Sequence, residues 1–381
     1  MIMHLLTYYS YYKFFLENKA KGHVVDPNRR GSSLPVDLIR TVAIVLVILL
    51  HAAIEPVPAS NIVNQAVVLR WWTVNIYNSL ASICVPLFVM LSGALLLQPN
   101  KVEEPLAVFF KKRFIRIGLP LIFWIGIYFA WRSFANNEVL TLNSIGQGIV
   151  TGPYFHFWYL YMLIGLYLVT PILRVLVAYA SRKVLRYFLI IWFMGTAIVP
   201  IVYLFVPFTL SGDVFLLVGW VGYFLLGLYL LDVHVRGRTL YSVLLVGYVW
   251  MAIGTYLITY LRGGSSQYFF YDYLGFTAII VSASLFLLLK SVPSNYFEKK
   301  SRPLNRLIHF ISVSSLAIFL LHVVIMESLQ RGYFGFRLSI TTMNPIIEIP
   351  LATIVTLLIC VCILYPVSKV SILKKIFGII N

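Results

Sequence analysis

An arginine and a histidine stand out in an otherwise apolar stretch near the start of the chain. Arg40 and His51 lie in the segment 36–54, VDLIRTVAIVLVILLHAAI. Eleven residues make about three turns of an α-helix, so the two side chains would face the same direction about 16 Å apart. An ionisable group costs roughly 2.5–3.5 kcal/mol at the centre of a bilayer, so its presence in a membrane helix indicates a function. We therefore expect this helix to contribute to a site.

His51 is the candidate for proton transfer. A histidine can remove a proton from an alcohol near neutral pH, a role that accelerates a reaction by roughly 10²–10⁴. Glu55 lies one turn later on the same helix face, where a carboxylate could fix the tautomer of the ring as its catalytic partner. The alternatives are a core histidine bonded to a backbone carbonyl and, for Glu55, a solvated carboxylate beside Pro56. We predict a catalytic role for His51 because it shares its helix face with Arg40.

Three arginines are candidates for binding an anion. Arg40 lies at the predicted inner boundary of the first membrane span, and Arg113 and Arg116 lie one turn apart in the segment 111–120, KKRFIRIGLP. Guanidinium groups bind phosphates through paired hydrogen bonds, so these side chains could hold an anionic cofactor such as a nucleotide. The alternative is that each arginine marks the cytoplasmic boundary of its span and extends toward the headgroups.

Further candidates lie in the fourth and ninth predicted spans. His156, Trp158 and Tyr159 gather at the outer end of the segment 153–174, PYFHFWYLYMLIGLYLVTPILR. A belt of aromatic side chains at the membrane interface explains the rings but not the histidine. His322 lies near the middle of its span, in SLAIFLLHVV, where an interhelical hydrogen bond is the alternative to a direct role. We predict that these four residues bind the substrate.

The elements that must position these residues are membrane helices. The chain of 381 residues is 60% hydrophobic and 11% charged, and its mean hydropathy is +0.89, which exceeds what a soluble globular protein needs. Apolar windows of about twenty residues, enough to cross ~30 Å of hydrocarbon, recur along its length. We predict an all-α polytopic membrane helix bundle with about ten transmembrane helices. The windows cover residues 36–54, 76–98, 114–131, 157–178, 187–206, 213–231, 240–260, 271–289, 310–329 and 347–368.

The basic residues orient this bundle. With ten spans both termini lie on the same side, and all but five of the 30 lysines and arginines fall on that side. Because basic residues concentrate in cytoplasmic loops, we place the N- and C-termini in the cytoplasm. The net charge of +17 then reflects topology and attraction to anionic headgroups. Nucleic acid is not expected as a partner, because no soluble domain presents a basic surface. The five exceptions are Arg70, Arg132, Arg262, Arg331 and Arg337.

Three regions follow from this pattern. Residues 1–35 form a cytoplasmic or interfacial tail that lacks the features of a signal peptide. Residues 36–368 form the membrane domain, with sizeable outer loops at 55–75 and 132–156. Residues 369–381 form a short basic cytoplasmic tail. The three cysteines lie inside predicted spans without ligand-like spacing, so we expect ordinary core residues rather than disulfides or a metal site.

Segments in consistent order resemble the acyltransferase-3 family of integral membrane O-acyltransferases, over about residues 34–366. DLIRTVAIVLVILLHAA contains the family's basic residue, ten intervening residues and histidine, at Arg40 and His51. KKRFIRIGLPLIFW contains its arginine, two residues, arginine element, at Arg113 and Arg116. FHFWYLYMLIGLYLVTPIL resembles its His-x-Trp-aromatic-Leu-Tyr signature, and VPLFVMLSGALLL, GWVGYFLLGLYL and SLAIFLLH are similar to other helices. Each string is weakly specific, but together and in order they are strongly specific.

This resemblance implies a stand-alone membrane acyltransferase domain of the plasma membrane, without the extracellular hydrolase-like domain of some relatives. It implies an acyl-CoA donor, acetyl-CoA in the subgroup concerned, that binds from the cytoplasm as a substrate, with no permanently bound cofactor. The acceptor would be a hydroxyl of a cell-envelope carbohydrate or glycolipid precursor. The resemblance assigns catalysis to His51. It assigns donor binding or structural support to Arg40, Arg113 and Arg116, whereas the role of Glu55 rests on spacing alone.

Two other functions stay open at this point. Ionisable residues inside the membrane could line the path of a transporter or flippase of a glycolipid or anionic metabolite, although no internal repeat is evident. Movement of a ligand without consumption of acyl-CoA would favour this alternative. A non-catalytic sensor or scaffold could keep the same fold, and a function that survives loss of His51 would favour it.

Overall fold

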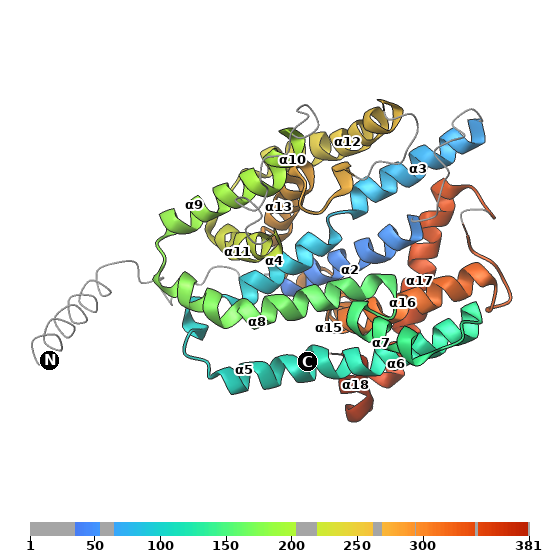
Figure 1. The fold of residues 1–381 in the computed structure, drawn as a ribbon. Coiled ribbons are helices and arrows are strands. Elements are labelled where there is room, and N and C mark those ends of the chain that lie inside the picture. Colours follow the sequence, from blue (N-terminus) through green and yellow to red (C-terminus); the bar gives the residue numbers. More distant parts are fainter. Residues whose placement is uncertain are drawn as a thin grey trace, which may run out of the picture. The chain divides into compact units, whose positions relative to one another are not determined.

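The computed structural model describes residues 35–53, 65–202, 219–261, 269–293, 295–339 and 342–379. Every regular element in these ranges is a helix, which confirms the predicted all-α class (Figure 1). Glu55 and all of the predicted N-terminal tail except Pro35 lie outside the described residues. The α-helices are α2 (Val36–Ala53), α3 (Gln65–Ala81), α4 (Cys84–Leu96), α5 (Leu106–Arg113), α6 (Leu119–Asn136), α7 (Leu142–Thr151), α8 (Trp158–Tyr179), α9 (Arg182–Phe193), α10 (Val199–Val202), α11 (Gly219–Tyr229), α12 (Gly237–Leu261), α13 (Phe276–Lys290), α14 (Tyr296–Lys300), α15 (Arg302–Val313), α16 (Ser315–Arg331), α17 (Pro345–Val367) and α18 (Ser371–Phe377).

The helices account for all ten predicted windows. Within the described residues, eight helical segments are long and apolar enough to cross a membrane, and the number is nine if a bent pair of helices counts as one span. The shorter apolar segment Gly219–Asp232 falls on the remaining window, 213–231, which begins outside the described residues. The exact number of spans and the side of the termini stay predictions.

The predicted span 310–329 falls mostly on α16 and includes the end of α15. α15 and α16 meet at Ser314 with a bend of 81°. α15 buries Ile311 but exposes Arg306, so it is amphipathic. Such a helix is more stable along a membrane interface than across the hydrocarbon. The hydropathy averaged over this window cannot detect the bend, because it contains no information on the direction of the chain.

The predicted outer loop 55–75 is also partly wrong, because α3 is helical from Gln65. The rings of Trp71 and Trp72 pack against Tyr256 of α12, with centroids 6.0 and 5.0 Å away. This tertiary packing accounts for the extension of the helix beyond the predicted window 76–98.

α2 lies at the centre of the bundle and packs against α3, α4, α15, α16 and α17 (Figure 1). Its buried face includes Ile39, Ala43 and Val47, which recur every fourth residue, as in an amphipathic helix that faces a core. Arg40 and His51 lie on this one continuous helix, as the spacing predicts. The central position of α2 brings both side chains within reach of several neighbouring helices.

Two glycines bring α4 and α11 into backbone contact. A Cβ atom at Gly93 would collide with the backbone of Phe224, and one at Gly227 would collide with that of Met90. Small residues allow such close approach in membranes, where helix association depends on packing. The contact fixes α4 and, with it, Ser92, which lines a cavity described below.

Candidate active site

Three of the predicted residues, all histidines, meet inside the bundle although they are distant in the sequence. The rings of His51 on α2 and His322 on α16 stack with their centroids 5.1 Å apart. His156, in the 3-10 turn Phe155–Phe157 before α8, has its ring centroid 5.7 Å from that of His322. We call these three residues the histidine cluster.

Most nitrogen atoms of the histidine cluster lack a hydrogen-bond partner. His322 Nδ1 lies 2.7 Å from the carbonyl oxygen of Phe319, so Nδ1–H donates and the lone pair falls on Nε2. This Nε2, both ring nitrogens of His156 and Nδ1 of His51 are buried and have no partner among the described residues. An unpaired buried polar atom costs about 1–3 kcal/mol, so these atoms point to a substrate or water as partner.

Aromatic rings enclose the histidine cluster. Phe155 presents its edge to His51, with the ring centroids 5.2 Å apart. Phe319 has its ring centroid 5.4 Å from that of His156 and 5.9 Å from that of His322. These rings give the histidines largely apolar neighbours, and a low-dielectric environment strengthens the electrostatic interactions of a reacting group.

A cavity connects the basic end of the bundle, predicted to be cytoplasmic, to these rings. Arg40 and Arg116 line one part of it, and Phe319 lines another. The volume of this cavity is about 70 Å³. Among the described residues that line it there is no carboxylate. We call it the inner cavity. Its lining residues are Arg40, Phe88, Leu91, Ser92, Leu95, Arg116, Ile117, Tyr159, Leu163, Tyr167, Ser315, Leu316 and Phe319.

Arg116 enters the inner cavity from an irregular turn. The π-helical turn η3 (Phe114–Gly118) joins α5 to α6, and such turns are frequent at functional sites because the extra residue redirects side chains. Arg113, at the end of α5, is not among the lining residues. Its guanidinium carbon lies 5.4 Å from the ring centroid of Phe109 and 5.5 Å from that of Tyr167. Tyr167 lines the inner cavity, whereas Arg113 contacts the Tyr167 ring without lining the cavity itself.

Glu104 pairs with two other cations near the inner cavity. It accepts hydrogen bonds from Lys112 Nζ at 2.6 Å and from Arg174 Nη1 at 2.9 Å. Glu104 lies in the loop before α5, and Lys112 first, then Arg174, hold the pKa of its carboxyl below the ordinary value. Arg174 is buried and also donates from Nε to the carbonyl oxygen of Leu96 at 2.8 Å. Arg174 therefore fastens α8 to the end of α4.

The two other predicted substrate residues, Trp158 and Tyr159, contact each other edge to face, with their ring centroids 6.4 Å apart, but have different further neighbours. Tyr159 lines the inner cavity together with Arg40. Trp158 belongs to a separate aromatic group, where its ring centroid is 5.7 Å from that of Trp220 and 5.6 Å from that of Tyr273. Neighbouring residues of a helix point about 100° apart, which accounts for their different surroundings.

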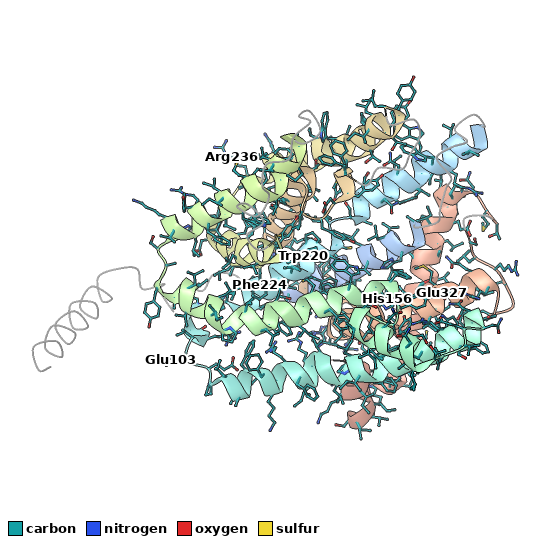
Figure 2. The ribbon with its side chains drawn as sticks, viewed as in Figure 1. Glu103, His156, Trp220, Phe224, Arg236 and Glu327 are labelled. Carbon is teal, nitrogen blue, oxygen red and sulfur yellow. The ribbon has the colours of Figure 1, made fainter. Side chains whose placement is uncertain are left out.

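Glu327, which the sequence reasoning did not include, is a polar residue beside the histidine cluster. Its carboxylate accepts hydrogen bonds from Trp131 Nε1 at 2.8 Å and from the hydroxyl of Tyr154. The ring centroid of Tyr154 lies 6.0 Å from that of His156, and Figure 2 shows Glu327 and His156 close together near the start of α8. An acid inside the predicted span 310–329 was a usable signal, because ionisable residues in the membrane are rare.

A second, polar pocket opens beside Phe155, whose ring centroid lies 5.2 Å from that of His51 and 5.4 Å from that of His156. It contains an ion pair between Arg132 and Glu138. We call it the outer pocket, following the predicted orientation. Its lining residues are Arg132, Asn136, Glu138, Ser144, Gln147, Gly148, Thr151, Gly152, Pro153, Tyr154 and Phe155.

Comparison with known proteins identifies the family of the chain. Residues 35–365 match the sequence model of the acyltransferase-3 family, which is described as an acyltransferase domain. No curated protein and no solved structure matches the chain significantly. The matched range includes the histidine cluster, the inner cavity and the outer pocket. The chain therefore belongs to the acyltransferase-3 family, and it is a membrane acyltransferase.

Proposed function

We propose that the protein transfers an acetyl group from acetyl-CoA to a hydroxyl of a cell-envelope carbohydrate or glycolipid precursor. The observation that carries this proposal is the inner cavity, which extends from two guanidinium groups to the rings around the histidine cluster. In this proposal the protein lies in the plasma membrane, the donor enters from the cytoplasm, and the acceptor comes from the other side.

The inner cavity suits a coenzyme A thioester. Arg40 and Arg116 supply two guanidinium groups, and no lining carboxylate competes with phosphate for them. Beyond the arginines the lining is largely apolar and includes Leu91, Leu163 and Phe319. An apolar lining matches the uncharged pantetheine arm. The phosphates would stay at the arginines while the thioester approaches the histidine cluster.

His51 is the proposed catalytic base. As the acceptor oxygen attacks the carbonyl carbon of the thioester, a ring nitrogen of His51 takes the proton of the hydroxyl. The C–S bond then breaks, and the coenzyme A thiolate leaves and receives this proton. His322 lies beside His51 with an unpaired Nε2 that can hold the acceptor hydroxyl or a water. A route in which His51 first carries the acetyl group on nitrogen uses the same residues and stays open.

Mass spectrometry of envelope glycans and lipids tests the proposal. Cells that produce the wild-type protein should carry an acetyl ester that is absent from His51→Ala cells, at equal amounts of protein in the membrane. His234→Ala is a matched control, because His234 is exposed between α11 and α12 and lines neither the inner cavity nor the outer pocket. An unchanged acetyl content in His51→Ala cells would remove His51 from the mechanism.

A further inference from the structure

The outer pocket lies one aromatic ring away from the proposed base. It is built from the end of α6, from α7 and from the turn that leads into α8. Phe155 lines the pocket and also presents its edge to His51, with the ring centroids 5.2 Å apart. A molecule in the outer pocket would therefore approach the histidine cluster from the side opposite to the arginines of the inner cavity.

The charges of the outer pocket are balanced. Arg132 forms a two-pronged ion pair with Glu138, in which Nε lies 2.8 Å from Oε2, and its Nη1 donates to the carbonyl oxygen of Pro153 at 3.2 Å. The guanidinium is therefore compensated before any ligand binds. In the inner cavity, by contrast, Arg40 and Arg116 have no carboxylate among the lining residues. Of these two spaces, the inner cavity has the charge that selects an anion.

The other polar groups of the outer pocket are amides and hydroxyls, which both donate and accept hydrogen bonds. Asn136, Gln147 and Thr151 are among them. The start of α7 is fixed by a capping box, in which the Thr141 and Ser144 side chains each accept from the other residue's backbone N–H at 3.1 and 2.9 Å. Asn136 Oδ1 already accepts from Arg331 Nη2 at 2.6 Å, and the Thr151 hydroxyl donates to the carbonyl oxygen of Gln147 at 2.9 Å. Sugar hydroxyls have the same mixed donor and acceptor character as the Gln147 amide, so a sugar is a suitable partner for that side chain.

Phe155 adds an apolar surface to this polar surrounding. Its side chain is 57% exposed, although the ring contacts His51. Pockets for small molecules combine aromatic walls with a few polar groups that fix orientation. A sugar ring has hydroxyls at its edge and C–H groups on its face. The edge matches the amides of the pocket, and the face matches the Phe155 ring.

We propose that the outer pocket binds the acceptor as an uncharged sugar unit that stacks on Phe155 and forms hydrogen bonds with Gln147. The inference rests on the proposed acetyl transfer and adds the chemical class and the position of the acceptor. The sugar hydroxyl that extends past Phe155 toward His51 is the one that receives the acetyl group. The bond changes are those given above: the O–acetyl bond forms as the C–S bond breaks.

The test measures acetyl esters on the glycans of cells that produce each full-length variant, together with acetyl-CoA binding by the purified proteins. Gln147→Ala should lower the degree of acetylation about 2- to 10-fold, as expected for one lost hydrogen bond. Phe155→Ala should lower it about 10-fold or more, as for a buried aromatic anchor, and Phe155→Tyr should retain it. Asn143→Ala is the matched control, since Asn143 is exposed on the same helix but does not line the pocket.

Donor binding should equal that of the wild-type protein in all these variants, and the ester should lie on an uncharged sugar. If Phe155→Ala displaces His51 and so lowers acetyl transfer for a different reason, Gln147→Ala still tests the outer pocket. Wild-type acetylation in Gln147→Ala and Phe155→Ala, or an ester on an acidic sugar or a non-sugar lipid, would overturn the assignment of the pocket while acetyl transfer stands. If wild-type cells carry no additional acetyl ester, acetyl transfer itself fails and the acceptor assignment fails with it.

Discussion

Replacing Arg116 with alanine should weaken the binding of coenzyme A far more than the same change at Arg113. Arg116 lines the inner cavity, whereas Arg113 stands behind Tyr167. A hydrogen bond to a charged group contributes about 1.5–3 kcal/mol, so Arg116→Ala should raise the dissociation constant about 10- to 150-fold. Arg113→Ala removes a cation–π contact of about 0.5–1 kcal/mol, which corresponds to a change of about 2- to 5-fold.

Calorimetric titration of the purified protein in detergent measures this difference. Coenzyme A supplies the phosphates, and S-acetylpantetheine, which has none, is the matched ligand. Arg116→Ala should lose affinity for coenzyme A only, and added salt should weaken binding to the wild-type protein as well. Equal losses in Arg113→Ala and Arg116→Ala, or an equal loss for S-acetylpantetheine, would refute the placement of the phosphates in the inner cavity.

Glu104→Gln should lower the melting temperature at neutral pH and flatten its acid dependence. The basic partners hold the pKa of folded Glu104 below the ordinary value of 4.5. Its carboxylate therefore stabilises the protein above pH 4.5, and this stabilisation is lost as the pH falls through the folded pKa. Thermal unfolding in detergent, measured from neutral pH to below the folded pKa, checks the melting temperature and its acid dependence. Gly93→Ala should cost about 1–3 kcal/mol of stability by forcing α4 from α11, whereas Gly126→Ala, whose Cβ would meet nothing within 4 Å in the interior of α6, should leave stability equal or raise it by up to about 1 kcal/mol. Glu327→Leu removes the acceptor of the Tyr154 hydroxyl and should reduce acetyl transfer in cells without changing coenzyme A binding; full transfer would assign Glu327 to the packing of α16 alone.

Much of the fold could be predicted because bilayer thickness dictates the length of an apolar helix. Every window of this length in the chain overlaps a helix. Hydropathy could not show the bend at Ser314, because an average over residues carries no information on direction. It also missed the helical residues from Gln65 onward, because their stability comes from packing against Tyr256 rather than from apolar content.

Part of the candidate site could likewise be predicted from the sequence, and part required the tertiary structure. Arg40 and His51 could be paired from the sequence because helical periodicity relates residues on one helix. The meeting of His51 with His156 and His322 depends on how α2, α8 and α16 pack, and no spacing in the sequence contains that information. Glu327 joins this region through side chains of two other segments, so its position too required the tertiary structure.

The two arginines after α5 show a local limit of sequence reasoning. Their spacing of one turn predicts that Arg113 and Arg116 share a helix face. The π turn that contains Arg116 changes the angle between them, so only Arg116 enters the inner cavity. Periodicity assumes uniform winding, and a π turn breaks that assumption at the place where a side chain is redirected.

We expect the π turn to matter for donor binding by this span but not for its insertion and assembly in the membrane. A π turn differs from a regular one by a single inserted residue. Loss of one codon within Phe114–Gly118 would therefore restore uninterrupted winding through the segment Leu106–Asn136 and keep both ends in phase with their neighbours. Such a deletion should permit insertion and assembly but withdraw the Arg116 guanidinium from the donor. A one-residue deletion elsewhere in the same segment would rotate everything beyond it by about 100° and prevent assembly.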